Sequence, residues 1–370
     1  MKPQPLKVII SGGGTGGHIF PALAIADELR QQRPGVQILF VGAKGRMEMD
    51  RVPKAGYPIK GLWISGFQRK MSWSNLLFPL KLVCSMAKAN TVLRQFKPDV
   101  VIGVGGYASG PTLRMAIRRK IPTLIQEQNS YPGITNRLLA KEVNKICVAY
   151  EDMEKWFSKE KTVLTGNPLR IKAVETVGKK EDALKYFQLI GSSTVAFITG
   201  GSQGALAINK AIKNNLQKIH HADIQLIWQT GKLFFGEARQ AVLDAGLSDK
   251  IKVVDFVERM DLAYAASDLV VSRAGAMAIS ELSFVGKAVI LVPLPTAAED
   301  HQTQNALRLV NRGAAVMIRN SEADKELLPA IIDLASNKKQ REEMSAGIQK
   351  FALPDAGKNI VAQILNLAQR

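Results

Sequence analysis

Short apolar and β-branched runs alternate with segments of helical periodicity along the whole chain. Runs of this kind, bounded by glycine, proline and polar residues, predict strands that are buried in a sheet. Their alternation with helices predicts parallel sheets with crossover helices, so the expected fold class is α/β with two doubly wound domains. The expected strands are Lys7–Ser11, Ile38–Gly42, Val100–Val104, Thr123–Gln126, Lys145–Val148 and Thr162–Leu164 in the first half, and Thr194–Thr199, Ile224–Gln229, Ile251–Phe256, Leu269–Ser272 and Val289–Pro293 in the second.

A break in this pattern at Thr165–Pro168 marks the expected seam between the domains, because glycine, asparagine and proline occur there together. We therefore expect an N-terminal domain at 1–166 and a C-terminal domain at 167–351, sizes that are usual for domains. The last segment, about 352–370, contains the breaker Pro354 and then an amphipathic helix. That helix can pack back on either domain, the N-terminal one included.

A glycine-rich loop follows the first strand of each half. Ser11–His18 has the sequence SGGGTGGH, and Gly200–Gly204 has the sequence GGSQG. Helical patterns follow both loops, and the first of these helices is expected to begin near Pro21. The backbone N–H groups of such a loop and the N-terminus of the following helix can hold a phosphate group. Two such loops predict two similar domains that face one cleft.

Further glycine-rich and polar segments follow other strands. Gly103–Pro111 supplies more backbone N–H groups, and Gln126–Asn129 places four polar side chains at the end of a strand. In the second half, Ser272–Glu281 and Val292–Gln302 leave their strands in the same way. Because ligands of open α/β sheets bind outside the carboxyl ends of the strands, all four segments are candidate ligand contacts. The two carboxylate oxygens of Glu281 suit a ribose diol.

A nicotinamide dinucleotide site is one alternative for the first loop. Gly12-x-Gly14-x-x-Gly17 has the spacing of the dinucleotide fingerprint. That fingerprint also needs an acidic residue at the end of the second strand, and Phe40–Lys44 supplies none. The loop ends instead in His18, which can exchange protons near neutral pH and suits a general base at the cleft.

Positive charge is concentrated in the first half of the chain. The formal net charge is +18; residues 1–166 hold 25 Lys and Arg against 11 Asp and Glu, a net +14, and the remainder carries +4. Nucleic acid, an anionic membrane and a phosphorylated substrate are candidate partners for such a half. Leu62–Lys81 mixes aromatic residues with cations, which indicates either a membrane-interface segment or an apolar stripe packed on the sheet.

Cysteine usage and the length of the apolar runs restrict the location. Cys84 and Cys147 have no CxxC spacing and no neighbouring histidine cluster, which argues against disulfides and zinc and fits a reducing cytoplasm. The first strand begins at Lys7, so we expect no signal segment before it. No apolar stretch has transmembrane length, and the expected protein is soluble or peripheral to a membrane.

Seven motifs together resemble one enzyme family. They occur in the order and spacing of the MurG family across nearly the whole chain: GGGTGGHIFPALA, GGYASGP, EQNSYPGITNRLL, TGNPLR, GGSQGA, SRAGAMAISE and DHQTQNA. The resemblance implies a GT-B fold, with two Rossmann-like domains and the active site between them. It also implies an inverting transfer of N-acetylglucosamine from UDP-N-acetylglucosamine to the C4 hydroxyl of the N-acetylmuramoyl unit of lipid I. The β1,4-linked product would be lipid II, made for peptidoglycan synthesis at the cytoplasmic face of the plasma (inner) membrane.

The resemblance assigns a role to residues on both sides of the cleft. Ser202 would contact the donor diphosphate, Val257 would line the uracil pocket, and Gln302 would bind sugar hydroxyls. The full set implied for UDP-N-acetylglucosamine is Thr15, Gly16, Gly17, Asn129, Arg170, Ser202, Val257, Ala276, Met277, Ala278, Ile279, Ser280, Glu281 and Gln302; the set implied for the acceptor diphosphate is Gly14, Gly105, Gly106, Tyr107 and Ser109. The family commonly has isoleucine where Val257 stands, a loss of one methylene that should matter little.

The implied mechanism needs a base and a site for the leaving diphosphate. We expect His18 to be the base, with Glu127 as the alternative or as its helper. The helix N-terminus at Gly201–Gly204 and Arg170 would hold the diphosphate, and no Asp-x-Asp is placed for a metal, so we expect no metal and no other cofactor. The expected partners are UDP-N-acetylglucosamine, an undecaprenyl-diphosphate-linked muramoyl-peptide acceptor and an anionic membrane surface, and nucleic acid is not expected.

Two other functions share some of these features. A UDP-N-acetylglucosamine 2-epimerase has similar domains and a similar donor site, but it needs no lipid acceptor, which would leave the basic first half and its tryptophan-rich segment unexplained. A non-enzymatic nucleotide-sugar or nucleic-acid binding protein could use the same charge. Such a protein has no use for a histidine at the cleft, and the aromatic residues lack the pattern of a base-stacking platform.

Overall fold

The computed structural model describes residues 5–66, 77–297 and 300–369 of the chain. It divides into two compact units, unit 1 formed by Met1–Leu169 with Leu353–Arg370 and unit 2 formed by Arg170–Ala352. The chain therefore passes from unit 1 to unit 2 a few residues after the sequence-based seam, and it returns to unit 1 for its last helix. The two units are described separately.

Unit 1 is built on a parallel sheet of seven described strands in the order β3-β2-β1-β4-β5-β6-β7. β1 is an inner strand of the sheet and pairs with β2 on one side and β4 on the other. Side chains of β1 alternate between two apolar layers, Val8 and Ile10 in one and Ile9 in the other. The strands are β1 (Lys7–Ser11), β2 (Gln37–Ala43), β3 (Ile59–Leu62), β4 (Val100–Gly103), β5 (Thr123–Glu127), β6 (Lys145–Val148) and β7 (Thr162–Leu164).

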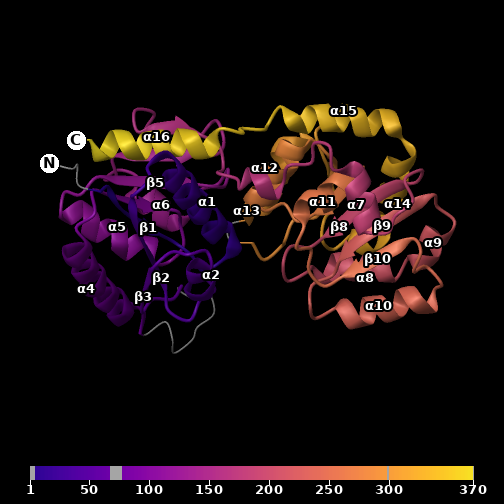
Figure 1. Ribbon diagram of the computed structural model, residues 1–370, viewed down its shortest axis with the longest axis horizontal. Coiled ribbons are helices and arrows are strands. Elements are labelled where there is room, and N and C mark those ends of the chain that lie inside the picture. The colour runs from indigo at the N-terminus through magenta and orange to yellow at the C-terminus, as the bar shows by residue number, and fades with distance from the viewer. Residues whose placement is uncertain (1–4, 67–76, 298–299, 370) are drawn as a thin grey trace. The chain divides into compact units, whose positions relative to one another are not determined.

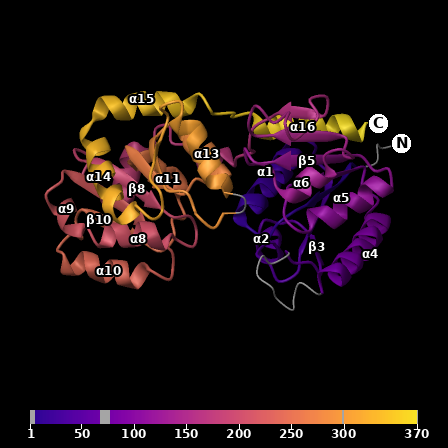
Figure 2. The ribbon, with the colours of Figure 1, turned by 180° about the vertical axis from the view of Figure 1, so that it is seen from behind.

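Helices cover both faces of this sheet. The layer that contains Val8 is completed by α1 and α16, and the layer that contains Ile9 is completed by α4, α5 and α6. Figures 1 and 2 show the yellow C-terminal helix α16 beside the indigo helix α1, so the two ends of the chain pack together. The helices of unit 1 are α1 (Gly16–Gln32), α2 (Glu48–Lys54), α4 (Phe78–Phe96), α5 (Ser109–Arg118), α6 (Ile134–Leu139) and α16 (Ala356–Ala368).

Unit 2 repeats the plan with a parallel sheet of six described strands in the order β10-β9-β8-β11-β12-β13. β9 lies between β8 and β10, and Trp228 of β9 is fully buried in the larger apolar layer. The strands are β8 (Thr194–Thr199), β9 (Ile224–Gln229), β10 (Ile251–Val254), β11 (Leu269–Ser272), β12 (Ala288–Leu291) and β13 (Val316–Met317).

Helices also cover both faces of the sheet in unit 2. The layer of Trp228 includes α8, α9, α10 and α14, and the opposite layer includes α7, α11, α12 and α13. The helices are α7 (Lys180–Tyr186), α8 (Leu206–Lys213), α9 (Leu216–His220), α10 (Phe235–Asp244), α11 (Met260–Ala266), α12 (Ala276–Val285), α13 (His301–Val310), α14 (Ala323–Ser336) and α15 (Lys338–Gln349), with a short 3₁₀ turn at Ile171–Ala173.

Three local expectations from the sequence were wrong. β3 and β13 were not expected; β3 contains Gly61 and β13 has two residues, so neither forms an apolar run. Helix α1 begins at Gly16 rather than near Pro21, and Pro21 lies inside it. Because proline has no N–H, Pro21 omits one backbone hydrogen bond of the helix without ending it. His18 therefore belongs to the first turn of α1.

Candidate functional site

A buried carboxylate supports the first glycine loop of unit 1. The side chain of Glu48, at the start of α2, is 1% exposed. Its Oε2 accepts a hydrogen bond from the N–H of Gly14 at 2.9 Å, and its Oε1 accepts one from the N–H of Ala43 at 2.9 Å. The Gly14 N–H that the sequence analysis assigned to the acceptor diphosphate is thus already donated inside the protein. Glu48 instead fixes the path of the loop between β1 and α1.

The glycine loop Gly103–Pro111 packs directly on the loop Ser11–His18, because β1 and β4 are neighbours in the sheet. Gly106 has φ +83°, and a Cβ on it would lie 2.2 Å from the carbonyl oxygen of Gly13. A Cβ on Gly105 would lie 2.7 Å from Cδ2 of His18. Only glycine allows the two backbones and the imidazole to approach so closely. The structure therefore brings these two loops and His18 together at the carboxyl edge of the sheet.

The imidazole of His18 is oriented by its own loop. Nδ1 lies 3.2 Å from the carbonyl oxygen of Gly13 and 3.2 Å from Oγ1 of Thr15. A carbonyl oxygen can only accept, so the contact with Gly13 places the proton of a neutral ring on Nδ1. Nε2 is then the basic nitrogen, on the side of the ring that faces Gly105. This is the tautomer that a general base needs.

The carboxylate of Glu127 is buried and hydrogen-bonded to the segment that follows it. Its carboxylate is 1% exposed and accepts from the N–H and Nδ2 of Asn129, the N–H of Gly133 and Nδ2 of Asn136, at 2.8 to 3.3 Å. Burial raises the pKa of Glu127, while these four donors oppose the rise. Its oxygens are occupied within one loop. Glu127 therefore shapes the loop after β5, and its role as the alternative base or as the helper of His18 stays a prediction.

Most of the other polar residues at the end of β5 are also internal. Gln126 and Gln128 are buried; Gln126 donates to Asn167, and Gln128 donates to the carbonyl oxygens of Val104 and Gln126. They bind the protein itself, contrary to the expectation for Gln126–Asn129. Asn129 is half-buried and remains the candidate of this segment.

The other candidates of unit 1 separate into accessible and inaccessible groups. Thr15, Gly17 and Tyr107 are exposed, and Gly16 is half-buried. Ser109 is buried, and its hydroxyl donates to the carbonyl oxygen of Gly106 at 3.0 Å. The Ser109 side chain thus secures the loop of Gly105 and Gly106, and its assignment to the acceptor diphosphate stays a prediction.

In unit 2 the loop Gly200–Gly204 lies at the carboxyl end of β8 and presents Ser202 as an exposed residue. Gly204 has φ +76°, and a Cβ on it would lie 1.9 Å from the carbonyl oxygen of Thr230. The N–H of Gly204 donates to the carbonyl oxygen of Gly201 at 2.9 Å. This tight turn leads into α8 and has the form expected of a phosphate-binding loop.

Glu281 lies on α12 and is linked to a buried tyrosine. The hydroxyl of Tyr264 donates to Oε2 of Glu281 at 3.1 Å, and Tyr264 is 2% exposed. Burial raises the pKa of Glu281 to about 7, although the hydrogen bond from Tyr264 acts in the opposite direction. Tyr264 thus holds one oxygen of the Glu281 carboxylate in place. With a pKa of about 7, this carboxyl changes its charge near neutral pH.

The remaining donor candidates differ in what they can offer to a ligand. The side chain of Ile279 is 2% exposed and packs in the core of unit 2, and its assignment to the donor stays a prediction. Val257 is buried, and its N–H donates to Gln229. Oε1 of Gln302 accepts from the N–H of Leu294 at 2.9 Å. Arg170 is exposed at the start of unit 2, Ala276 is buried, and Met277, Ala278 and Ser280 are half-buried on α12.

Glu48, Tyr264 and Gln229 support the site, and the sequence analysis gave none of them this role. Each is buried and bonds to a candidate residue or loop. The signal that could have found Glu48 and Gln229 is a polar side chain next to an apolar strand at the carboxyl edge of a parallel sheet. Among the described residues, no three His, Cys, Asp or Glu side chains gather as they would around a metal ion.

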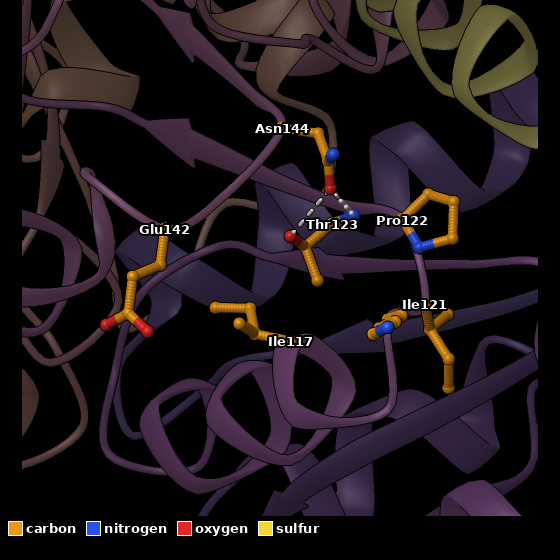
Figure 3. A pocket seen from close by; sticks show the side chains of 7 residues that line it. Ile117, Ile121, Pro122, Thr123, Glu142 and Asn144 are labelled. Carbon is orange, nitrogen blue, oxygen red and sulfur yellow. Dashed lines mark hydrogen bonds between the residues drawn. The ribbon is translucent and has the colours of Figure 1, made fainter.

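One pocket lies at the opposite edge of the sheet of unit 1. Figure 3 shows Thr123, at the start of β5, donating through its N–H and hydroxyl to Oδ1 of Asn144, at 2.8 and 3.2 Å. The lining also includes Ile117, Pro122 and Glu142. This is the amino end of β5, away from the glycine loops, so the pocket is not where an α/β sheet binds its substrate.

Helix α4 presents apolar side chains to solvent. Leu80 is 53% exposed and Val83 is 65% exposed, and Trp63, which precedes α4 in the chain, is 47% exposed. Nζ of Lys81 lies 5.8 Å from the centre of the Trp63 ring and donates to Ser65. Arg69 and Trp73, in the middle of the segment Leu62–Lys81, lie outside the described residues. No described helix combines the length and apolarity needed to cross a bilayer.

Comparison with known proteins shows which family this chain resembles. The chain matches the glycosyltransferase family 28 N-terminal domain over residues 8–148 and the glycosyltransferase family 28 C-terminal domain over residues 195–360. It is 51% identical to the UDP-N-acetylglucosamine–N-acetylmuramyl-(pentapeptide) pyrophosphoryl-undecaprenol N-acetylglucosamine transferase of Bacteroides fragilis, over 99% of this chain and 96% of that protein.

Solved structures agree with the sequence relatives. The crystal structure of MurG from Acinetobacter baumannii superimposes with a TM-score of 0.79 at 30% identity, covering 98% of this chain and all of that one. A UDP-GlcNAc 2-epimerase from Neisseria meningitidis bound to UDP-GlcNAc superimposes with a TM-score of 0.67 at 18% identity, over 98% of this chain and all of that one. The second likeness concerns the fold alone.

Proposed function

Because this chain belongs to the MurG family of glycosyltransferases, we propose that unit 2 binds the nucleotide sugar and unit 1 binds the lipid-linked acceptor. The chain has the GT-B fold and transfers N-acetylglucosamine from UDP-N-acetylglucosamine to lipid I, which gives lipid II for peptidoglycan synthesis. The observation that carries the division of substrates is the pair of glycine loops, one at the carboxyl edge of each sheet. The residues around the two loops differ, and this difference supports the donor at the loop of unit 2 and the acceptor at the loop of unit 1.

The donor half of the proposal rests on what surrounds the loop of Ser202. This loop offers an exposed hydroxyl beside a tight backbone turn, which suits a diphosphate. Glu281 offers a carboxylate oriented by Tyr264, which suits the two hydroxyls of a ribose. Arg170 would add positive charge to the leaving diphosphate as the glycosidic bond breaks. Val257 and the half-buried residues of α12 would contact the nucleoside.

The acceptor half rests on His18 and the loops around it. We place the acceptor diphosphate on the backbone of Gly105 and Gly106, next to the exposed Tyr107. Nε2 of His18 would take the proton of the C4 hydroxyl while that oxygen attacks the anomeric carbon from the face opposite the diphosphate. One direct displacement inverts the configuration, so the α-linked donor gives a β1,4 product. Thr15, Gly16, Gly17 and Asn129 keep the role that the resemblance implies for them, as contacts of unit 1 with UDP-N-acetylglucosamine.

Membrane contact is the third part of the proposal. The acceptor carries an undecaprenyl chain, so an enzyme that uses it has to work at a membrane surface. Leu80 and Val83 of α4 form an exposed apolar stripe in the half of the chain that carries a net charge of +14. Apolar side chains among cations are typical of a peripheral contact with an anionic leaflet. We propose that this stripe lies on the cytoplasmic face of the plasma membrane.

An assay with two substrates tests the activity against its alternative. Purified protein is incubated with UDP-N-acetylglucosamine, with and without a lipid I analogue, and both UDP and the sugar are followed. A glycosyltransferase releases UDP when the acceptor is present and forms a β1,4-linked disaccharide. Conversion of UDP-N-acetylglucosamine to its 2-epimer without the acceptor would favour an epimerase. Binding without turnover under both conditions would favour a non-enzymatic binding protein.

A substitution tests the role of His18. His18→Gln removes the basic nitrogen, and we expect kcat to fall by roughly 10² to 10⁴, the usual contribution of a general base. Affinity for UDP should stay unchanged because unit 2 would hold the donor. His220→Gln, at an exposed histidine of α9, is the matched control and should keep full activity. If His18→Gln turns over at the wild-type rate, His18 is not the base.

A further inference from the structure

Gln229 is the last residue of β9, and its side chain joins the segments that follow the two neighbouring strands. The side chain is 3% exposed. Its Nε2 donates to Oγ1 of Thr199 at 3.1 Å and to the carbonyl oxygen of Gly201 at 2.9 Å. Its Oε1 accepts from the N–H of Val257 at 2.8 Å. One amide therefore links the loop after β8 to the segment after β10.

The backbone around Gln229 is interlocked as well. A Cβ on Gly231 would lie 2.2 Å from the carbonyl oxygen of Gln203, so the loop after β9 packs on the loop after β8. Oγ1 of Thr199 also accepts from the N–H of Gly201 at 3.2 Å. The segment of Val257 has no such backbone contact with the Gly200–Gly204 loop among the hydrogen bonds of the described residues. The loop after β9 joins them indirectly, because the N–H of Gly231 donates to the carbonyl oxygen of Asp255 at 3.1 Å. Among the described residues, Gln229 supplies a side-chain amide that bonds to both segments directly.

We propose that Gln229 is a positioning residue of the donor site, which holds the diphosphate-binding loop and the Val257 segment at the separation that one nucleoside diphosphate spans. This inference rests on the donor assignment proposed above. Gln229 does not touch the ligand; it acts through Gly201 and Val257. Two contact segments that are fixed before binding need not be ordered by the ligand, which strengthens binding.

The same strand provides a matched control. Gln225 lies in β9 near its amino end, is 2% exposed, and also uses both ends of its amide. Its Oε1 accepts from the N–H of Ile190 at 2.8 Å, and its Nε2 donates to the carbonyl oxygen of Ile190 at 2.7 Å. Gln225→Met therefore removes a buried bridging amide of the same kind without touching the carboxyl edge of the sheet.

The experiment compares Gln229→Met with Gln225→Met in the full chain. UDP binding is measured by calorimetry, KM is measured for each substrate, and the melting temperature is measured for both variants. We expect Gln229→Met to raise the Kd for UDP and the KM for UDP-N-acetylglucosamine roughly tenfold, because the variant loses all three hydrogen bonds of the amide and the ligand must then order both segments. The acceptor KM should stay within twofold of wild type. Gln225→Met should lower the melting temperature and leave both donor constants unchanged.

The outcomes separate this inference from the proposal beneath it. Unchanged or tighter UDP binding by Gln229→Met, or an equal loss of UDP affinity in Gln225→Met, overturns the positioning role. If Ser202→Ala and Glu281→Ala also leave UDP affinity unchanged, the donor assignment itself fails. If Gln229→Met does not fold, Gln229→Asn takes its place, because it keeps both amide groups but is one methylene too short to reach both neighbours. It must show the same selective loss of donor affinity.

Discussion

At the scale of single residues, the charge of Glu281 couples donor binding to pH. Burial raises the pKa of this carboxyl from 4.5 to about 7 in the free protein. The two ribose hydroxyls are best bound by the ionised form, since only that form carries no proton on either oxygen and can accept with both, Oε2 accepting from Tyr264 as well. We expect the affinity for UDP-N-acetylglucosamine to rise about tenfold between pH 6 and pH 8, as the ionised fraction rises. Calorimetry at a series of pH values measures this.

The control for this pH dependence is a charge change elsewhere in unit 2. Glu281→Gln should bind the donor more weakly at pH 8 and lose the pH dependence. Glu343→Gln, at an exposed position of α15, should keep the wild-type affinity at pH 8 and the wild-type pH dependence. The effect on stability has the opposite sign. A carboxyl whose folded pKa is raised contributes stability below its ordinary value of 4.5, and that contribution is lost as the pH rises through about 7. A pH profile that is identical in wild type and Glu281→Gln would contradict the ribose role.

Residue identity alone could not separate ligand contacts from internal supports. Glu127 and Glu48 are both acidic residues near strand ends, and the sequence analysis selected Glu127 because it stands in a polar run. The structure surrounds Glu127 with four donors and uses Glu48 to hold the loop of Gly14. A carboxylate becomes a support when tertiary structure brings backbone N–H groups to it. The distance between the carboxylate and those N–H groups cannot be derived from the sequence.

At the scale of elements, the exposed stripe of α4 predicts where the membrane contact fails. Leu80→Glu combined with Val83→Glu replaces two exposed apolar side chains of one helix by charges of the same sign as the lipids. Binding to vesicles that contain phosphatidylglycerol should fall at least about tenfold, from lost apolar burial and added repulsion. Sedimentation of vesicles with bound protein measures this.

A matched pair in unit 2 serves as the control for α4. Val177 and Leu233 are 86% and 99% exposed, so Val177→Glu combined with Leu233→Glu makes the same charge change at sites outside α4. We expect that variant to bind vesicles like wild type, and added salt to weaken the wild-type binding. Equal losses in the two double variants would mean that net charge decides the binding and that α4 is not the contact.

Elements were predicted where composition and period agreed. β1, β8, β9 and β11 are β-branched or apolar runs that end in a polar residue, and their bounds match the expectation, as do those of β6. β3 was missed because Ile59–Leu62 contains Lys60 and Gly61, and it forms a strand by pairing with β2 at the edge of the sheet. The start of α1 was missed because the glycines before Pro21 resemble a loop. Pairing and packing decided both cases.

At the scale of the whole molecule, unit 1 depends on both ends of the chain. Ile360, Val361 and Ile364 of α16 are fully buried in the layer formed with α1. We expect Ile364→Ala to destabilise unit 1 by about 2 to 4 kcal/mol, the usual effect of truncating a buried isoleucine. UDP binding should stay at the wild-type level, since unit 2 would hold the donor. Urea unfolding and calorimetry on the same sample measure both quantities.

Lys358→Ala is the control on the same helix. It removes an ion pair with Asp355 in which both side chains are more than half exposed, and exposed pairs contribute little to stability. Its unfolding midpoint should match wild type. An unchanged unfolding midpoint in Ile364→Ala would mean that α16 does not stabilise unit 1. A loss of UDP affinity as large as that of Ser202→Ala would mean that α16 also affects unit 2.

The packing of α16 on α1 also sets the order in which the protein can be made. Ribosomes release a chain from its N-terminus, and domains usually fold in that order. Here the first segment of unit 1 emerges before the helix that completes its core, because α16 follows the whole of unit 2 in the sequence. Unit 2 is one continuous segment and can fold during synthesis. The nascent chain must therefore keep the α16-binding face of α1 from misfolding or aggregating until α16 has been translated, and during that interval unit 1 is most prone to aggregation.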